Sequence, residues 1–288
     1  MKVGIVGAGR LGFALAIALD KKGFDITGVY SKSDESAKLL CDKLNTSLPN
    51  DLAYTVRNSD TVFITVPDGQ IISVADAICM ENETGGIAGK TFFHCSGALS
   101  SDELTAISKL GAYTASFHPI QTFADRENSW TGLDRIFFGF EGCNEAKLMA
   151  ETIVLAFSSD MLVINKENKP LYHAAACIMS NYMVTLSYIA GRLFESIGIN
   201  AEAGVRAFSP LLKKTVDNIS LLGSFDALTG PISRGDYNVV DKHIAQMETE
   251  NQKMIPVYKL LGRITVEAAL QKGSIGEEAS QRLLKLLE

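Results

Sequence analysis

The chain begins with Lys2-Val3-Gly4-Ile5-Val6-Gly7-Ala8-Gly9-Arg10-Leu11-Gly12, and this stretch decides the fold. Residues 3–6 form a short apolar run ending at glycine, which is typical of a buried strand. The glycines have G-x-G-x-x-G spacing, and apolar residues at helical spacing continue to Leu19. A second strand is predicted over residues 26–30. Because strand, glycine turn, helix and strand follow in this order, the motif indicates a dinucleotide-binding unit.

The glycines of this turn have separate predicted roles. Gly7 permits the tight turn, Gly9 lets the backbone approach a pyrophosphate, and Gly12 lets the helix pack closely on the strand. The phosphates would lie at the helix N-terminus, where free amides and the helix dipole favour an anion. The alternative is a Rossmann-shaped domain that binds no ligand. The predicted cofactor-binding residues of the turn are Gly7, Ala8, Gly9, Arg10, Leu11 and Gly12.

The end of the second strand predicts which dinucleotide binds. An NAD site places an acid roughly 20 residues after the glycines, to accept hydrogen bonds from the ribose. Here residues 30–33 read Tyr-Ser-Lys-Ser, and no acid occurs before Asp34. A hydroxyl and an ammonium bind the 2′-phosphate that a carboxylate would repel. We therefore predict NADP(H), with Ser31 and Lys32 on the phosphate and Arg10 assisting; Ser33 can at the same time cap the next helix.

Composition limits the function classes. A length of 288 residues predicts about two domains, and a net charge of -6 argues against a nucleic-acid surface. The five cysteines are scattered without C-x-x-C spacing, which predicts reduced thiols in the cytoplasm. A strand beginning at residue 2 leaves no room for a signal peptide. Residues 171–191 carry no charge, but their polar side chains favour a buried helix in a helical domain or dimer core over a membrane span.

Strands and helices alternate through the first half of the chain, which indicates a doubly wound parallel sheet. Strands are predicted at residues 61–66, 91–94, 112–117, 135–141 and 161–164, a short extended piece at 53–56, and helices at 34–44, 70–80, 101–110 and 145–157. Only helices follow, at 171–197, 202–222, 239–252 and 256–272. The predicted fold is an α/β Rossmann domain over residues 1–166 and an all-α domain over 167–288, which binds substrate and forms a dimer.

Ligands of open parallel sheets bind beyond the carboxyl ends of the strands. Four loops should therefore converge there, at residues 7–12, 66–69, 94–98 and 117–123. The first would bind phosphate. The others, including Val66 and Pro67, would flank the nicotinamide and its ribose, with the helical domain closing over them.

Four sequence features carry a family resemblance: residues 65–68 (TVPD), 94–99 (HCSGAL), 117–123 (FHPIQTF), and 228–231 (LTGP) with 234–236 (RGD). Together they resemble Rossmann-like NADP oxidoreductases that have a C-terminal domain of unknown function. These proteins belong to the 6-phosphogluconate dehydrogenase-like superfamily, with pyrroline-5-carboxylate reductase, ketopantoate reductase and prephenate dehydrogenase as relatives. The resemblance covers nearly the whole chain. It implies NADP-dependent redox chemistry and a homodimer built from the helical halves, without indicating a substrate.

The sequence departs from the hydroxyacid dehydrogenases and ketopantoate reductase, which place a catalytic lysine one helical turn before an asparagine. The equivalent helix here offers His173, with Cys177 and Asn181 one and two turns later. In one interpretation His173 donates a proton and Asn181 orients a carbonyl. In the other, this polar stripe, which includes Ser180, is a hydrogen-bonded seam between helices or subunits.

The remaining candidates lie on the strand-end loops. His118 follows a strand and precedes Pro119, so we predict contact with substrate or cofactor; the alternative is a loop histidine bonded to main-chain carbonyls. Ser96 is the predicted substrate contact of its loop, whereas His94 is predicted to be structural. Zinc held by the three histidines is disfavoured, because none is adjacent in sequence and a nicotinamide enzyme needs no metal, so no metal is predicted.

Two functions fit these features. The first is an NADPH-dependent reductase of a small carbonyl or imine compound. The second is a non-catalytic NADP(H)-binding protein that reports redox state. The motifs around His118 and Thr229 favour the enzyme, because a sensor would need only the loops of the first domain.

Overall fold

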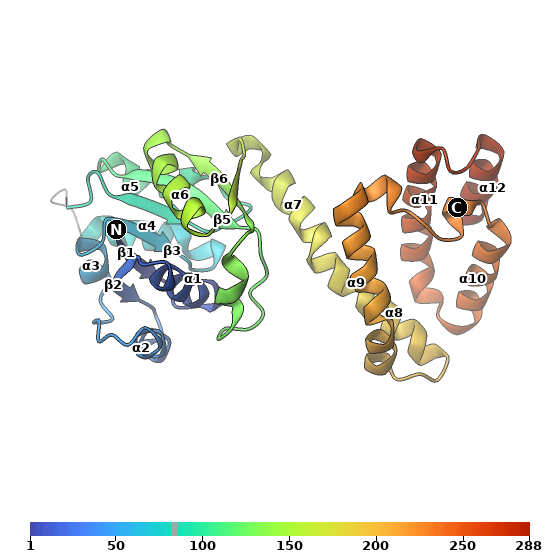
Figure 1. The fold of residues 1–288 in the computed structure, drawn as a ribbon, viewed down its shortest axis with the longest axis horizontal. Coiled ribbons are helices and arrows are strands. Elements are labelled where there is room, and N and C mark those ends of the chain that lie inside the picture. The colour runs from blue at the N-terminus through green and yellow to red at the C-terminus, as the bar shows by residue number, and fades with distance from the viewer. Residues whose placement is uncertain (82–85) are drawn as a thin grey trace. The chain divides into compact units, whose positions relative to one another are not determined.

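The structure, a computed structural model, describes residues 1–81 and 86–288. The chain divides into two compact units, Met1–Ser180 and Asn181–Glu288. The first unit is built around a sheet and the second is helical (Figure 1). Helix α7 (Lys169–Met179) follows the predicted boundary at residue 166 but belongs to the first unit, because its Lys169 and Tyr172 side chains contact the strand ends.

The first unit contains a sheet with the strand order β2-β1-β3-β4-β5-β6-β7. Its strands are β1 (Lys2–Val6), β2 (Asp25–Tyr30), β3 (Thr61–Ile64), β4 (Thr91–His94), β5 (Tyr113–Pro119), β6 (Phe137–Gly142) and β7 (Asp160–Val163). All neighbours pair in parallel except β5 and β6, which are antiparallel. The predicted doubly wound parallel sheet is confirmed, with this one pair as the departure. A parallel neighbour needs a crossover connection, whereas residues 120–136 return to the sheet through a loop and one short 3₁₀ helix, Ser129–Leu133.

Helices cover both faces of the sheet, as the doubly wound prediction requires. Helices α1 (Arg10–Lys21), α2 (Asp34–Lys43) and α6 (Asn144–Ala156) pack on the face that carries Phe63 and Phe93. Helices α3 (Leu52–Arg57), α4 (Ile71–Glu81) and α5 (Thr105–Lys109) pack on the face that carries Val62, Ile64 and Phe92. The two sets alternate along each strand because successive side chains point to opposite faces.

Residues 53–56, predicted to be extended, lie in helix α3 instead. The Asp51 side chain caps this helix by accepting a hydrogen bond from the Tyr54 amide at 2.6 Å. A Cβ at Gly28 would lie 2.5 Å from Thr55 Cα, so α3 packs directly on the backbone of β2. The prediction is wrong because it overlooked the cap, which is the stronger local signal in so short a helix.

Stacked phenylalanines join the strands whose ends carry the site. The ring centroids are 5.2 Å apart for Phe63 and Phe93, 5.2 Å for Phe93 and Phe117, and 4.7 Å for Phe117 and Phe138. These rings come from β3, β4, β5 and β6 in order, and all four are buried. The row fixes the spacing of the strands below the loops that follow β4 and β5.

The second unit contains helices α8 (Asn181–Ser196), α9 (Ala201–Asp226), α10 (Tyr237–Glu250), α11 (Ile255–Lys272) and α12 (Glu277–Leu287). The helix predicted over residues 171–197 is interrupted at Ser180, where φ is -116° and ψ is -69°. Helix α9 contains a non-helical residue at Gly223, with φ of 79°. The buried core of this unit lies among α10, α11 and α12 and includes Val240, Ile244, Val266, Leu283 and Leu287.

The apolar stretch on both sides of Ser180 is exposed in the single chain. Among the described residues, one helical stretch, Lys166–Ser196, is long and apolar enough to cross a membrane by length and composition. One such stretch is weak evidence, because core helices of soluble proteins meet the same criteria. Only 6% of its apolar window is buried, and the predicted burial in a helical domain or dimer core stays a prediction.

Candidate functional site

The glycine turn has the geometry that its spacing predicts. Gly7 has φ of 110°, and its amide donates to the Tyr30 carbonyl at 2.7 Å. A Cβ at Gly12 would lie 1.9 Å from Gly7 O, whereas a Cβ at Gly9 would meet open space. Thr65 Oγ1 donates to Gly7 O at 2.6 Å and so joins the turn to the end of β3. The turn is therefore tight at both ends and open at Gly9.

Helix α1 presents free amides at this turn. Its N-cap, Gly9, supplies no capping side chain, and its first turn contains no acid. Arg10 is exposed, Leu11 is half-buried, and Ala8 is buried. A helix start without a cap or an acid is suited to a bound anion.

Arg126 reaches this turn from the loop between β5 and β6. Its Nη2 donates to Ala8 O at 2.9 Å, and its guanidinium carbon lies 4.9 Å from the centre of the Phe13 ring. Its Nε is buried and has no hydrogen-bond partner among the residues that the structure describes. Burying an N–H without a hydrogen bond costs free energy. An anion held by the turn could accept this bond from the guanidinium.

A cavity of about 440 Å³ lies beside the glycine turn at the ends of β2 and β3. Within the described part of the chain, the Lys32 ammonium has no ion-pair partner. The predicted cap is confirmed, since Ser33 Oγ accepts from the Ser36 amide at 3.2 Å. Pro67 is exposed just past the end of β3. The cavity is lined by Gly7, Tyr30, Ser31, Lys32, Val66, Gln70, Ser73 and Val74.

A second group of side chains lies at the carboxyl ends of β4 and β5. His118 Nδ1 and Tyr172 Oη are 2.8 Å apart, and the His118 and His173 ring centroids are 6.2 Å apart. Gly97 lies between the two imidazoles, since a Cβ there would be 2.6 Å from His173 Nδ1 and 3.1 Å from His118 Nε2. Within residues 1–81 and 86–288, buried His173 Nδ1 has no hydrogen-bond partner. The loop after β4, the end of β5 and helix α7 therefore meet at one point.

Burial sets the protonation of the His118–Tyr172 pair. Burial, together with the nearby Lys169 and His173 charges, lowers the pKa of His118 to about 4, while Asp68 opposes the change. Burial raises the pKa of Tyr172 to about 12, so the phenol keeps its proton at neutral pH. At pH 7 the pair is a neutral imidazole bonded to a neutral phenol, which can relay a proton without carrying charge.

Lys169 is a buried cation that sequence reasoning missed. Its Nζ donates to Ser96 O at 3.1 Å and to Ser116 Oγ at 2.5 Å. Burial lowers its pKa to about 8, while the Glu141 and Asp68 carboxylates oppose this change. The available signal was that Lys169 lies one helical turn before His173. The catalytic lysine of the dehydrogenases lies one helical turn before an asparagine.

The Ser96 hydroxyl is fully engaged within its own loop. It donates to Asp68 Oδ2 at 2.8 Å and accepts from the amides of Ala98 and Leu99 at 3.2 and 3.1 Å. These bonds fix the shape of the loop, and the predicted contact of Ser96 with substrate stays a prediction. The Ser96 carbonyl, rather than its hydroxyl, accepts the hydrogen bond from Lys169 Nζ.

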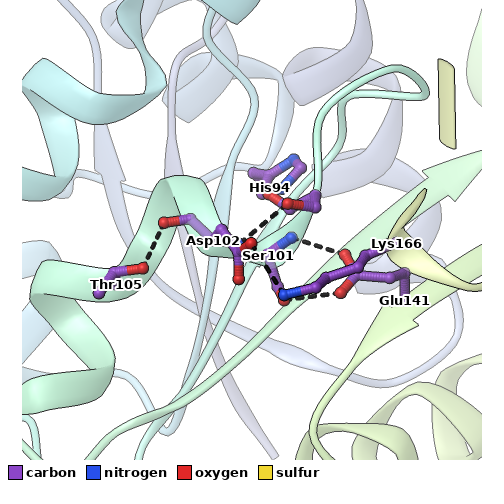
Figure 2. A network of polar contacts seen from close by, with 7 residues as sticks. His94, Ser101, Asp102, Thr105, Glu141 and Lys166 are labelled. Atoms are coloured by element: carbon purple, nitrogen blue, oxygen red, sulfur yellow. Dashed lines mark hydrogen bonds and ion pairs between the residues drawn. The ribbon is translucent and has the colours of Figure 1, made fainter.

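His94 lies within the network that anchors this loop, shown in Figure 2. It is fully buried, its Nε2 bonds Ser100 O at 2.9 Å, and its Nδ1 accepts from the Ser96 amide at 3.2 Å. Burial lowers its pKa to about 4. Glu141 on β6 accepts from the Ser101 amide and hydroxyl at 2.6 and 2.8 Å. His94 is structural here, as predicted.

The polar stripe predicted on one helix is divided. Cys177 Sγ lies 3.6 Å from His173 Nε2 on α7, so the structure brings these two together. Ser180 marks the break, and Asn181 begins α8 as an exposed residue of the second unit. Among residues 1–81 and 86–288, no three His, Cys, Asp or Glu side chains are grouped to hold a metal ion.

These features define a Rossmann-type nucleotide-binding fold with a polar cluster at its strand ends. Residues 1–119 match the Rossmann-like domain family, and residues 136–265 match a domain of unknown function (DUF2520). The chain therefore carries a Rossmann-like domain followed by a domain of unknown function, which confirms the two-domain resemblance drawn from its motifs. No curated protein matches the chain.

Solved structures with the same fold include three that span the chain. A candidate NADP oxidoreductase from Bacteroides fragilis is 24% identical over 92% of this chain and 98% of its own, with a TM-score of 0.74. A protein from Thermotoga maritima is 27% identical over 95% and 100%, with a TM-score of 0.72. An imine reductase from Myxococcus stipitatus, in complex with NADP⁺, is 18% identical over 99% and 100%, with a TM-score of 0.66.

Proposed function

We propose that this protein is an NADP(H)-dependent oxidoreductase that transfers a hydride between the nicotinamide and a small carbonyl or imine compound. The observation that carries the proposal is the His118–Tyr172 pair, at 2.8 Å, which lies at the same carboxyl edge of the sheet as the glycine turn. The Myxococcus stipitatus imine reductase, which shares the fold, binds NADP⁺. The five free cysteines agree with the proposed cytoplasmic location.

The residues present fit the proposed cofactor. The uncapped start of α1 and the open space at Gly9 suit a pyrophosphate, with Arg126 close by. The cavity beside Ser31 and Lys32 suits an adenosine ribose that carries a 2′-phosphate, because Lys32 has no ion-pair partner among the described residues. When bound, the nicotinamide supplies or accepts the hydride.

The chain's own groups would move the proton. Tyr172 donates to His118 Nδ1 in this proposal, which leaves a proton on Nε2 on the side of Gly97. A neutral imidazole gives this proton to a developing alkoxide or nitrogen anion while Nδ1 takes the Tyr172 proton, and water then returns a proton to the Tyr172 oxygen. Lys169 holds Ser96 O and Ser116 Oγ and keeps a positive charge near the pair, which favours the neutral form of His118.

A substrate screen tests this function. We expect NADPH oxidation with at least one member of a panel of small 2-oxo acids, imino acids and aldehydes, followed by absorbance at 340 nm, the nicotinamide band. Tight NADPH binding without turnover across the panel would contradict the proposal. That outcome would support the non-catalytic redox-sensing alternative.

The proposed cofactor preference is tested at Lys32. Lys32→Ala is expected to weaken NADPH binding about tenfold, because one charge-assisted hydrogen bond to the 2′-phosphate is lost. NADH lacks this phosphate and should bind the variant as well as it binds the parent protein. Calorimetric titration with both nucleotides measures the difference. Equal losses for NADPH and NADH would assign Lys32 a general rather than a phosphate-specific role.

We further propose a homodimer formed through the helical unit. An apolar groove of about 360 Å³ lies between α8 and α9, lined by residues such as Met183, Phe208 and Leu211. Large side chains beside it are exposed, among them Tyr188 at 65% and Leu211 at 62%. So much apolar surface on one unit is typical of an interface, and burial by a second copy accounts for it.

Light scattering tests the dimer. Leu211→Glu is expected to shift the protein from dimer to monomer at micromolar concentration, because a charge would enter the buried apolar contact. Leu148→Glu is the matched control, since Leu148 is 68% exposed on α6 of the first unit. A monomeric parent protein, or equal behaviour of the two variants, would contradict the proposal.

A further inference from the structure

The chain between β2 and α2 is held by a side chain from a different loop. Asn50, just before α3, accepts from the Ser31 amide through Oδ1 at 2.8 Å. Its Nδ2 donates to the Ser31 carbonyl at 2.9 Å and to Asp34 Oδ1 at 2.5 Å. The three partners determine the orientation of the Asn50 amide. The Ser31 N–H needs an acceptor, whereas the Ser31 carbonyl and the Asp34 carboxylate each need a donor. One side chain therefore satisfies both backbone groups of Ser31.

This clamp acts on the segment that lines the nucleotide cavity. Ser31 and Lys32 border the cavity of about 440 Å³ beside Gly7. β2 ends at Tyr30, so Ser31 is the first residue beyond the strand. Without Asn50 both of its backbone groups would lose these partners. With Asn50 the backbone is fixed, and the directions of the Ser31 hydroxyl and the Lys32 stem are limited.

The same amide also engages the nearest acid. Asp34 is the first carboxylate after β2, in the first turn of α2. An unengaged carboxylate here would repel a ribose phosphate. Because Asn50 Nδ2 donates to Asp34 Oδ1, the carboxylate is held against the clamp, and the amide dipole offsets part of its charge. Ser33 is committed to capping α2, which leaves Ser31 and Lys32 as the polar side chains of the segment.

We infer that Asn50 is a positioning residue for the 2′-phosphate, and that it sets the preference for NADP(H) over NAD(H) without touching the nucleotide. It does so by holding the Ser31–Lys32 backbone in its binding shape and by restraining Asp34. This inference rests on the proposed NADP(H) function and deepens it. A residue that only stabilised the fold would affect both nucleotides equally.

The test measures the dissociation constants of NADPH and NADH for the full-length protein and its variants. Asn50→Ala is expected to weaken NADPH binding about tenfold and NADH binding less than about threefold, since three hydrogen bonds that shape the phosphate end are lost. Asn50→Asp keeps the acceptor for the Ser31 amide but sets a second carboxylate against Asp34. It is expected to weaken NADPH binding about a hundredfold and to retain NADH binding.

Asn58→Ala is the matched control. Asn58 Nδ2 donates to Tyr54 O at 2.8 Å at the other end of α3, and its loss is expected to leave both affinities unchanged. Circular dichroism and the melting temperature without nucleotide report whether each variant is folded. If Asn50→Ala is unfolded, the comparison of the two nucleotides is made with Asn50→Asp. Equal weakening of NADPH and NADH, or no change in either, overturns the inference. Failure of the parent protein to bind NADPH would instead overturn the proposed function.

Discussion

His118→Ala is expected to lower kcat by about 10²–10⁴-fold, the usual contribution of a positioned proton-transfer group. The loss should fall on kcat rather than on NADPH affinity, because the cofactor cavity is lined by other residues. Steady-state kinetics with the substrate found in the screen, together with NADPH titration, separates the two effects. Tyr172→Phe should give a smaller decrease, because His118 keeps its own proton but loses the group that replenishes it.

The second unit offers a matched control for this prediction. His243 Nδ1 and Tyr258 Oη are also 2.8 Å apart, with the rings edge-to-face as in the His118–Tyr172 pair. His243 is exposed on α10 of the second unit, and its pair is made within that unit. His243→Ala is therefore expected to leave kcat unchanged. A His118→Ala enzyme with full kcat would exclude His118 as the proton donor.

Stability is expected to fall steeply as the pH drops from about 6.5 to about 4. Burial lowers the pKa of both His94 and His118 to about 4 in the folded protein. The unfolded chain takes up protons on these residues near pH 6.5, whereas the folded chain does not until about pH 4, so acid favours unfolding. Each histidine contributes a loss on the order of 3 kcal/mol across this window, which is large beside a typical stability of about 5–15 kcal/mol.

Urea unfolding at a series of pH values measures this loss. His94→Gln keeps an N–H for the Ser100 carbonyl but does not titrate, so the variant should lose less stability between pH 6.5 and pH 4 than the parent protein. The quantity to compare is the slope of the unfolding free energy against pH, because carboxylates titrate in both the parent protein and the variant. Identical slopes would show that His94 becomes protonated in the folded state.

Local sequence signals predicted most of the first unit. Buried strands read as apolar runs, and the glycine turn identified the first strand, the first helix and the second strand. The signals failed where a residue's partner lies far along the chain. β6 resembles any other buried strand, and its antiparallel direction follows from the path of residues 120–136. Helix α3 is a different case, because its cap, Asp51, is a local signal three residues from Tyr54 that the prediction of an extended piece overlooked.

Only part of the candidate site could be predicted, because some of its residues are brought together by contacts between distant segments. His118 and His173 were predicted from their positions after a strand and on an apolar helix, and the structure brings them to either side of Gly97. Lys169 was missed because its burial and its bonds to Ser96 and Ser116 depend on segments more than 50 residues away. Tyr172 became a candidate only through its contact with His118.

The sequence by itself determined the order of elements, the phosphate-binding turn and the absence of an acid between β2 and Asp34, because each depends on residues close together in the chain. The protonation states of His118 and Lys169 and the Asn50 clamp were decided only by the tertiary structure. The physical reason is that desolvation and hydrogen-bond geometry depend on which distant side chains share a volume, and no local pattern records this.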